Sequence, residues 1–321
     1  SYQSLATWRD CLLRGGRMIL LLDSASLWYR AFYGMPDSLR SPSGAPVNAV
    51  RGFLDSVARL ANAYQPKQIV ACLDGDWRPS WRTELIPEYK AARDLAVEED
   101  EERIQEEIDL ESQVPVILDL LDAIGLPIIG IDDYEADDVI ATLATREAGP
   151  CVIATGDRDL FQLVDDRKPI KVAYLAKGIS SHELVDLKWI SERYGIPGER
   201  YALMALLRGD PSDGLPGVRG IGEKGAAKIV SHFGSVSEII NAAENNDERL
   251  TSSLCKKLLD GKEYLDRALP VVTCVRDLRL PTLAPALPKS VSDRAKIDQL
   301  VEEYGVGTSV NRLLAALALV E

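Results

Sequence analysis

Short apolar runs alternate with amphipathic segments along the first 175 residues of this chain. Three of the runs are apolar at every position, as expected of parallel strands that are buried on both faces. They cover residues 18–22, 69–73 and 151–154. The segments 47–64, 114–124 and 135–147 carry apolar residues at helical spacing. This alternation predicts an α/β fold with a mainly parallel central sheet flanked by helices.

Each apolar run is followed by acidic residues. Asp23 ends the first run and Asp74 follows the second, while Asp157 and Asp159 follow the third after a Thr-Gly turn. An Asp beside a Gly is often only a turn residue. Because the carboxyl ends of parallel strands meet at one edge of a sheet, where ligands bind, we expect these side chains to lie close together.

Residues 134–140, Tyr-Glu-Ala-Asp-Asp-Val-Ile, place three acids at the start of a predicted helix. Taken alone, Glu135, Asp137 and Asp138 are typical helix-start residues, favoured by the helix dipole. Together with the strand-end acids and a later Gly-Asp-Pro-Ser-Asp turn, however, they form a large set that needs positive charge to stay ionised. The full set is Asp23, Asp74, Glu135, Asp137, Asp138, Asp157, Asp159, Asp210 and Asp213.

Such a carboxylate set predicts a metal site. Two divalent ions bound there would stabilise the attacking water and the leaving oxygen of a phosphodiester. The chain has only two histidines, His182 and His232, and five widely separated cysteines. Oxygen ligands therefore dominate, which favours Mg²⁺ or Mn²⁺ over Zn²⁺.

Residues 76–111 interrupt the strand and helix alternation. Their first part mixes aromatic and basic residues, a composition that suits contact with a single nucleic-acid strand. Lys90 and Arg93 would neutralise charge that builds up on a transferred phosphate. The second part, 98–111, holds nine acids and one Arg103 and predicts a polar helix, which fits a solvated surface insertion equally well.

A glycine hairpin at 218–230 precedes another predicted helix. Gly220 and Gly222 let backbone N–H groups approach a phosphate closely. The basic residues Arg219, Lys224 and Lys228 add positive charge. A glycine hairpin between helices also occurs for purely structural reasons, so this signal is moderate by itself.

The net charge of −13 at first argues against a polyanionic substrate. The nine-carboxylate set and segment 98–111 account for this excess, and the remaining residues are mildly basic. Nucleic acid therefore stays a candidate partner.

The scattered cysteines predict a reducing, cytoplasmic location, and the absence of an apolar run of about 18 residues predicts no membrane span. We expect residues 1–17 to be a dispensable leader.

The motifs, in this order and spacing, resemble the 5′-nuclease superfamily, most of all the bacterial flap endonuclease and 5′-3′ exonuclease family related to the nuclease domain of DNA polymerase I. The motifs that carry the resemblance are Leu22-Asp23-Ser24, Leu73-Asp74-Gly75, Trp81-Arg82, Tyr89-Lys90-Ala91-Ala92-Arg93, Tyr134 to Asp138, Thr155 to Leu160, and Gly209 to Gly222. The resemblance implies a PIN-like nuclease core at 18–195 and a helical arch at 76–111. It also implies a helical carboxyl-terminal subdomain at 196–321 with a helix-three-turn-helix element at 209–233.

The resemblance also implies roles for individual residues. Asp23, Asp74, Glu135, Asp137 and Asp138 would hold the first metal ion, and Asp157, Asp159, Asp210 and Asp213 the second. Catalytic roles would fall to Lys90, Arg93 and Arg82. DNA contacts would come from Tyr89, Arg219, Gly220, Gly222, Lys224 and Lys228, and backbone carbonyls of the hairpin would hold K⁺. Gly214 stands where the family more usually has a polar residue.

The function implied is a free-standing, metal-dependent 5′ nuclease of DNA replication and repair. It would be a monomer that acts on DNA with a 5′ flap, a nick or a junction between single strand and duplex, in functional coupling with a DNA polymerase and a ligase. A non-catalytic DNA-junction-binding protein and a PIN-like ribonuclease are the alternatives. The complete carboxylate set disfavours the first, and the hairpin and long insertion disfavour the second.

Overall fold

The computed structural model describes residues 17–92 and 101–319, which form a six-stranded sheet with helices on both faces. The strand order is β3-β2-β1-β4-β5-β6, so β1 lies between β2 and β4. The first five strands are parallel and β6 is antiparallel to β5. Their bounds are β1 Ile19–Asp23, β2 Gln68–Cys72, β3 Ile128–Ile129, β4 Cys151–Thr155, β5 Ile170–Tyr174 and β6 Glu183–Val185. The predicted α/β fold with a mainly parallel sheet is confirmed.

Alternate residues of each central strand enter different hydrophobic cores, which explains why the strands are apolar throughout. In β1, Leu20 and Leu22 face one core, while Ile19 and Leu21 face the other. The first core is covered by α2 Ser24–Gly34, α3 Asn48–Tyr64 and α7 Val114–Ile124. The second is covered by α8 Ala136–Arg146 and continues into the later helices.

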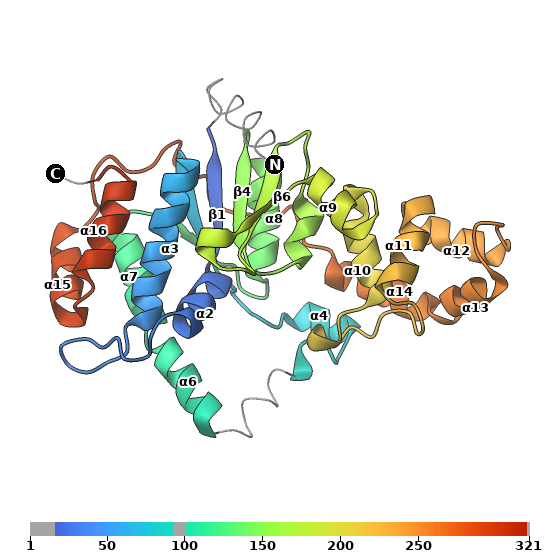
Figure 1. Cartoon of the computed structure of the whole chain (residues 1–321), viewed down its shortest axis with the longest axis horizontal. Coiled ribbons are helices and arrows are strands. Elements are labelled where there is room, and N and C mark those ends of the chain that lie inside the picture. The colour runs from blue at the N-terminus through green and yellow to red at the C-terminus, as the bar shows by residue number, and fades with distance from the viewer. Residues whose placement is uncertain (1–16, 93–100, 320–321) are drawn as a thin grey trace.

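Those later helices extend the molecule to one side of the sheet (Figure 1). They are α9 Leu187–Tyr194, α10 Tyr201–Arg208, α11 Glu223–His232, α12 Val236–Glu244, α13 Ser252–Asp260 and α14 Lys262–Val272. Two further helices, α4 Ser80–Leu85 and α6 Glu101–Glu111, lie below the edge of the sheet at which β1 ends (Figure 1). The predicted arch at 76–111 therefore contributes α4 and α6 to the described structure.

The last two helices correct the predicted subdomain at 196–321. Helices α15 Arg294–Tyr304 and α16 Gly307–Ala316 return to the nuclease core, where α15 packs on α7 and α16 on α3 (Figure 1). The backbone N–H groups of Ser292 and Asp293 bond the Ala123 carbonyl at 2.9 Å, which fixes the return. The physical reason is that the outer side of α3 is apolar and needs a covering helix.

No helix in the described ranges is both long and apolar enough to cross a membrane.

The packing of α16 predicts the cost of one truncation. Leu313 is fully buried against the core, so Leu313→Ala should lower the free energy of unfolding by about 2–5 kcal/mol. The matched control is Leu259→Ala in α13, where the leucine is 39% exposed and its removal should cost far less. Urea denaturation followed by circular dichroism measures both. Equal losses in the two variants would contradict the assignment of α16 to the core.

Candidate active site at the carboxyl edge of the sheet

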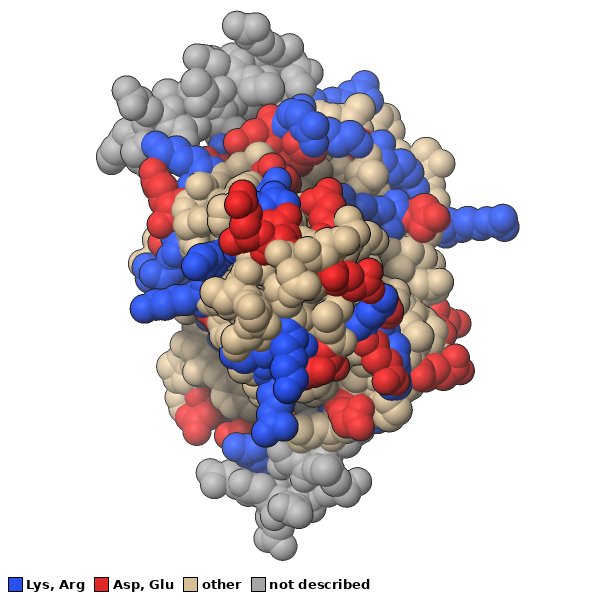
Figure 2. All heavy atoms as spheres, turned by 90° about the vertical axis from the view of Figure 1, so that its right-hand side faces the viewer, with Lys and Arg blue, Asp and Glu red and all other residues tan. Residues whose placement is uncertain are grey.

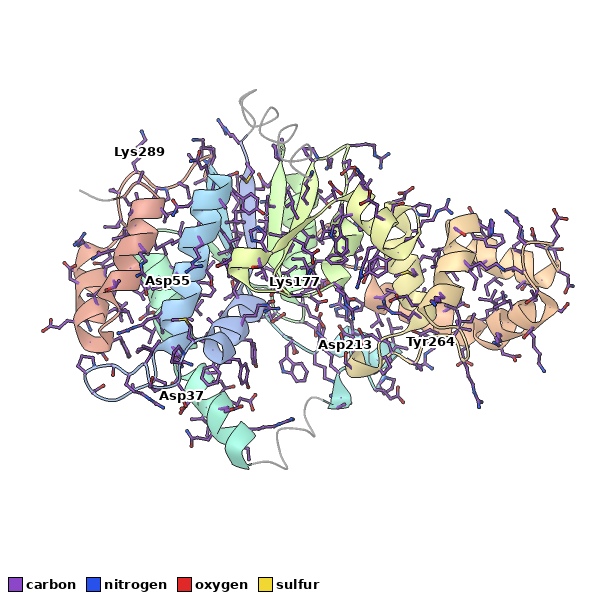
Figure 3. The ribbon with its side chains drawn as sticks, in the orientation of Figure 1. Asp37, Asp55, Lys177, Asp213, Tyr264 and Lys289 are labelled. Carbon is purple, nitrogen blue, oxygen red and sulfur yellow. The ribbon has the colours of Figure 1, made fainter. Side chains whose placement is uncertain are left out.

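A pocket of about 1550 Å³ opens where β1, β2 and β4 end. Because β1 pairs with β2 on one side and β4 on the other, these three strand ends bring distant parts of the sequence together. Eight of the nine predicted acids line this pocket: Asp23, Asp74, Glu135, Asp137, Asp157, Asp159, Asp210 and Asp213. Figure 3 labels Asp213 at the junction between the core and the lateral helices.

Asp23 is fixed by two hydrogen bonds. Its Oδ1 caps α2 by accepting from the Ser26 N–H at 3.2 Å, and its Oδ2 accepts from the Thr155 hydroxyl at 2.6 Å. Burial raises the pKa of Asp23 to about 7, and the charges of Asp74 and Asp157 act in the same direction. The hydrogen bond from Thr155 opposes them by favouring the ionised form.

Two other carboxyl groups in the pocket, those of Asp137 and Asp159, also have raised pKa values. Burial raises the pKa of Asp137 well above its usual range, with further contributions from Asp157 and Asp23. Burial raises the pKa of Asp159 to about 8, and Asp157 and Asp213 add to the shift. The pocket thus carries more negative charge than its own cations balance, and a bound cation would relieve that repulsion.

Among the described residues, Lys90 is one of three cations that line this pocket, together with Arg30 and Arg158. Its Nζ lies 3.0 Å from Glu135 Oε1 and donates to the Trp77 carbonyl at 3.2 Å. Burial lowers the pKa of Lys90, but Glu135, Asp213 and Asp137 outweigh it, so the net pKa is raised. The Lys90 ammonium therefore stays protonated at neutral pH.

The backbone of Lys90 is docked on the turn that carries the last two acids. Its N–H donates to the Asp213 carbonyl at 3.0 Å. The next residue of the turn, Gly214, has φ +71°, and a Cβ there would lie 2.0 Å from the Glu88 carbonyl oxygen. Glycine is thus required for this close approach, which explains why a polar residue is absent at position 214.

The structure corrects the predicted roles of Asp138 and Arg82. Asp138 is fully buried, does not line the pocket, and accepts from Arg82 at 2.8 and 2.9 Å and from the Val275 N–H at 2.8 Å. This geometry does not support the predicted metal-ligand role of Asp138, and Arg82, only 2% exposed, faces Asp138 and not the pocket. The capping box that Asp138 forms with Glu135 was the sequence signal for this structural role.

Tyr89, predicted as a DNA contact, is largely buried in this structure. It is 5% exposed, and its hydroxyl donates to Glu135 Oε1 at 2.9 Å. Its ring is thus closed to a DNA base, and its hydroxyl orients the Glu135 carboxylate. Arg93, predicted to be catalytic, lies outside the described residues, as does most of the predicted leader at 1–17.

Two hydroxyl residues of the site were missed by the sequence analysis. Thr155 is fully buried, donates to Asp23 and accepts from the Asp157 N–H at 2.8 Å, so it joins the two strand ends. Ser26 accepts from the Gly156 N–H at 2.7 Å and holds the same turn from the other side. A polar residue that ends a fully apolar strand was the available signal for Thr155.

The glycine hairpin has the predicted exposed cations. Arg219, Lys224 and Lys228 are exposed around the start of α11. Gly220 has φ +78°, and its carbonyl accepts from Lys257 Nζ at 3.0 Å. Figure 2, which faces this end of the molecule, shows Lys and Arg interspersed with Asp and Glu. The hairpin is therefore a mixed surface with local positive charge.

The donor chemistry of the pocket fits a hard divalent cation. Within residues 17–92 and 101–319, no three His, Cys, Asp or Glu side chains stand close enough together to hold an ion. Mg²⁺ commonly uses only one or two carboxylates and completes its shell with waters and substrate phosphates. Eight carboxylates around one open pocket, with raised pKa values for three of them, suit that mode of binding.

Substitution of the adjacent acids Asp137 and Asp138 should affect the free energy of unfolding differently. Asp138→Asn would remove the bidentate partner of the buried Arg82 and leave only Glu135 at 3.5 Å, and we expect a loss of about 3–5 kcal/mol in unfolding free energy. Asp137→Asn removes a carboxylate whose ionised form the folded pocket disfavours, so it should not lower stability at pH 7 in EDTA. Urea denaturation of both variants measures this difference. A similar loss in both would refute the distinct roles.

Comparison with known proteins agrees with this architecture. Residues 18–195 match the family "5'-3' exonuclease, N-terminal resolvase-like domain" and residues 196–294 match "5'-3' exonuclease, C-terminal SAM fold". A 5'-3' exonuclease of Streptomyces coelicolor is 49% identical over 300 residues, covering 93% of this chain and 99% of that protein. A 5'-3' exonuclease of Mycobacterium tuberculosis is 43% identical, covering 93% and 97%. DNA polymerase I of Mycobacterium bovis is 33% identical, covering 94% of this chain and 32% of the polymerase.

Solved structures share the fold at lower sequence identity. T5 5'-exonuclease with bound zinc has a TM-score of 0.65 at 18% identity, over 94% of this chain and 100% of that chain. Human GEN1 in complex with Holliday junction DNA has a TM-score of 0.62 at 16% identity, over 94% and 73%. Both family matches together span most of the sequence, and eight of the nine motif acids meet in one pocket. The chain therefore belongs to the 5′-3′ exonuclease family of nucleases.

Proposed function

We propose that this nuclease hydrolyses DNA phosphodiesters near junctions between single strand and duplex, including 5′ flaps and nicks, in replication and repair. The observation that carries the proposal is the convergence of eight carboxylates and Lys90 on one open pocket. A related T5 protein is described as a flap endonuclease in complex with DNA and metal ions, which supports the substrate class.

The proposed cofactors are two or more Mg²⁺ or Mn²⁺ ions. The residues that would hold them are Asp23, Asp74, Glu135 and Asp137 on one side, and Asp157, Asp159, Asp210 and Asp213 on the other. Bound divalent ions supply Lewis acidity and lower the pKa of a bound water. Oxygen donors, with no histidine in the pocket lining, favour these hard ions.

Side chains in and behind the pocket wall fix the orientation of Glu135 and offset negative charge on a bound phosphate. Lys90 is held by Glu135 and the Trp77 carbonyl at the pocket wall, where its ammonium can offset charge that develops on a phosphate. Tyr89 fixes Glu135 by a hydrogen bond, and Arg82 lies 3.5 Å from the same carboxylate. These contacts pre-organise the site before DNA binds.

Substrate positioning falls to the elements around the pocket. Helix α6 contributes Glu107 and Glu111 to the pocket wall, so a single strand that passes there meets acidic side chains on that side. The exposed cations of the hairpin suit phosphate contacts with duplex DNA. At this hairpin the ammonium of Lys257 already occupies the Gly220 carbonyl, and K⁺ on neighbouring carbonyls is a further proposal.

Cellular context is proposed on more general grounds. Four described cysteines, Cys72, Cys151, Cys255 and Cys274, are free and buried, which fits a cytoplasmic location. We further propose that the protein acts as a monomer, coupled functionally to a DNA polymerase and a ligase.

The metal mechanism predicts loss of cleavage without loss of fold. Asp159→Ala, or excess EDTA with the unaltered protein, should abolish cutting of an end-labelled 5′-flap duplex, because the carboxylates would no longer hold the ions. Mn²⁺ or Mg²⁺ added after EDTA should restore activity only to the unaltered protein. Circular dichroism verifies folding. Persistent cutting by Asp159→Ala would refute the mechanism.

The hairpin predicts binding that depends on salt and not on sequence. Lys224→Ala should weaken binding to duplexes of different sequence by a similar factor, and the slope of log affinity against log salt should fall by about 1. The control is Lys289→Ala, at an exposed lysine on the opposite side of the molecule from the pocket (Figure 3). Fluorescence anisotropy in EDTA measures binding without cleavage. A sequence-dependent effect would contradict phosphate contact.

A further inference from the structure

A second pocket of about 490 Å³ lies between β5, β6 and α9. Its wall combines aromatic and basic side chains with two acids, namely Arg158, Tyr174, Lys177, Glu183, Trp189, Glu192, Arg193 and Tyr194. Arg158 and Tyr174 also line the carboxylate pocket. The two pockets are therefore neighbours that share a wall, and we call the second one the aromatic pocket.

The rings of the aromatic pocket are held rigidly. Phe161, fully buried, makes edge contacts with Tyr174 at 5.1 Å and with Trp189 at 5.6 Å between ring centroids. Trp189 in turn contacts Tyr194 at 6.2 Å. All three pocket rings are half-buried, so part of each ring stays open to solvent. A ring that is already fixed loses little conformational freedom when a base stacks on it.

The cations of the aromatic pocket suit a phosphate. Arg158 lies in the chain between Asp157 and Asp159 and lines both pockets. Arg193 is exposed at the end of α9. The two acids in the wall are each paired with a lysine, Glu183 with Lys177 at 3.1 Å and Glu192 with Lys188 at 3.5 Å. Two guanidinium groups thus border an aromatic surface beside the proposed cleavage site.

We propose that the aromatic pocket binds one nucleotide of the DNA strand beside the cleaved bond. Its base would stack against Trp189 or Tyr194, and its phosphate would contact Arg158 and Arg193. This inference rests on the proposed DNA substrate and adds a second subsite to it. The shared Arg158 favours a nucleotide of the bound strand over a free nucleotide, because this residue lines both the carboxylate pocket and the aromatic pocket.

Charge reversal on α9 tests the phosphate contact. Arg193→Glu should weaken binding of a 5′-flap duplex and lower the salt slope by about 1, whereas Lys289→Glu, at an exposed lysine outside the pocket, should change neither. Anisotropy in EDTA measures binding without cleavage. Equal effects of the two variants would mean general repulsion and would overturn the proposal.

A scan with abasic nucleotides tests the stacking. One abasic position near the flap junction should weaken binding to the unaltered protein by about 5- to 150-fold, the contribution of one stacked base. Trp189→Leu, checked for folding by thermal denaturation, should lose this position dependence. If Trp189→Leu does not fold, Arg193→Glu still decides the phosphate contact. No sensitive position in the unaltered protein would overturn the stacking.

The tests separate this inference from the proposed function. If the unaltered protein cuts flap DNA and Arg193→Glu binds and cuts it equally well, only the aromatic pocket proposal fails. If the unaltered protein cuts no DNA with either metal, the proposed function itself fails.

Discussion

The buried ion pair between Arg82 and Asp138 joins three parts of this protein, namely the base of the arch, the core and the lateral helices. Arg82 comes from α4 at the base of the arch, and Asp138 comes from the first turn of α8 in the core. Arg82 Nε also donates to the Val271 carbonyl in α14, and Asp138 accepts from the Val275 N–H just beyond it. Burying two charges is costly, but the pair is bidentate and its remaining polar atoms are bonded, which offsets the desolvation.

A chain of contacts leads from this ion pair to the residues that line the pocket. Arg82 also lies 3.5 Å from Glu135, which accepts from Tyr89 and pairs with Lys90. The backbone of Lys90 then holds the turn that carries Asp213. A change in the hidden ion pair would therefore displace carboxylates that never touch it. Such support is what keeps crowded, mutually repelling ligands in place.

In contrast to the neutralised Arg82–Asp138 pair, the carboxylate pocket holds unneutralised negative charge. Its acids are concentrated at strand ends, where burial and mutual repulsion raise the pKa values of Asp23, Asp137 and Asp159. This arrangement destabilises the isolated protein locally and makes cation binding favourable. Stability is thus contributed by residues behind the site, while the site holds the charge that the chemistry uses.

The sequence by itself determined the α/β fold and most of the site. Short, fully apolar runs are typical of parallel strands buried on both faces, and acids that follow such strands meet at one sheet edge. Only the tertiary structure could separate Asp137 from Asp138, because neighbouring residues on a helix point about 100° apart and sequence does not say which faces a pocket. It also decided that Tyr89 and Arg82 are buried, and that α15 and α16 return to the core. Those outcomes depend on which distant side chains cover each residue, and that is a property of packing between elements far apart in the chain.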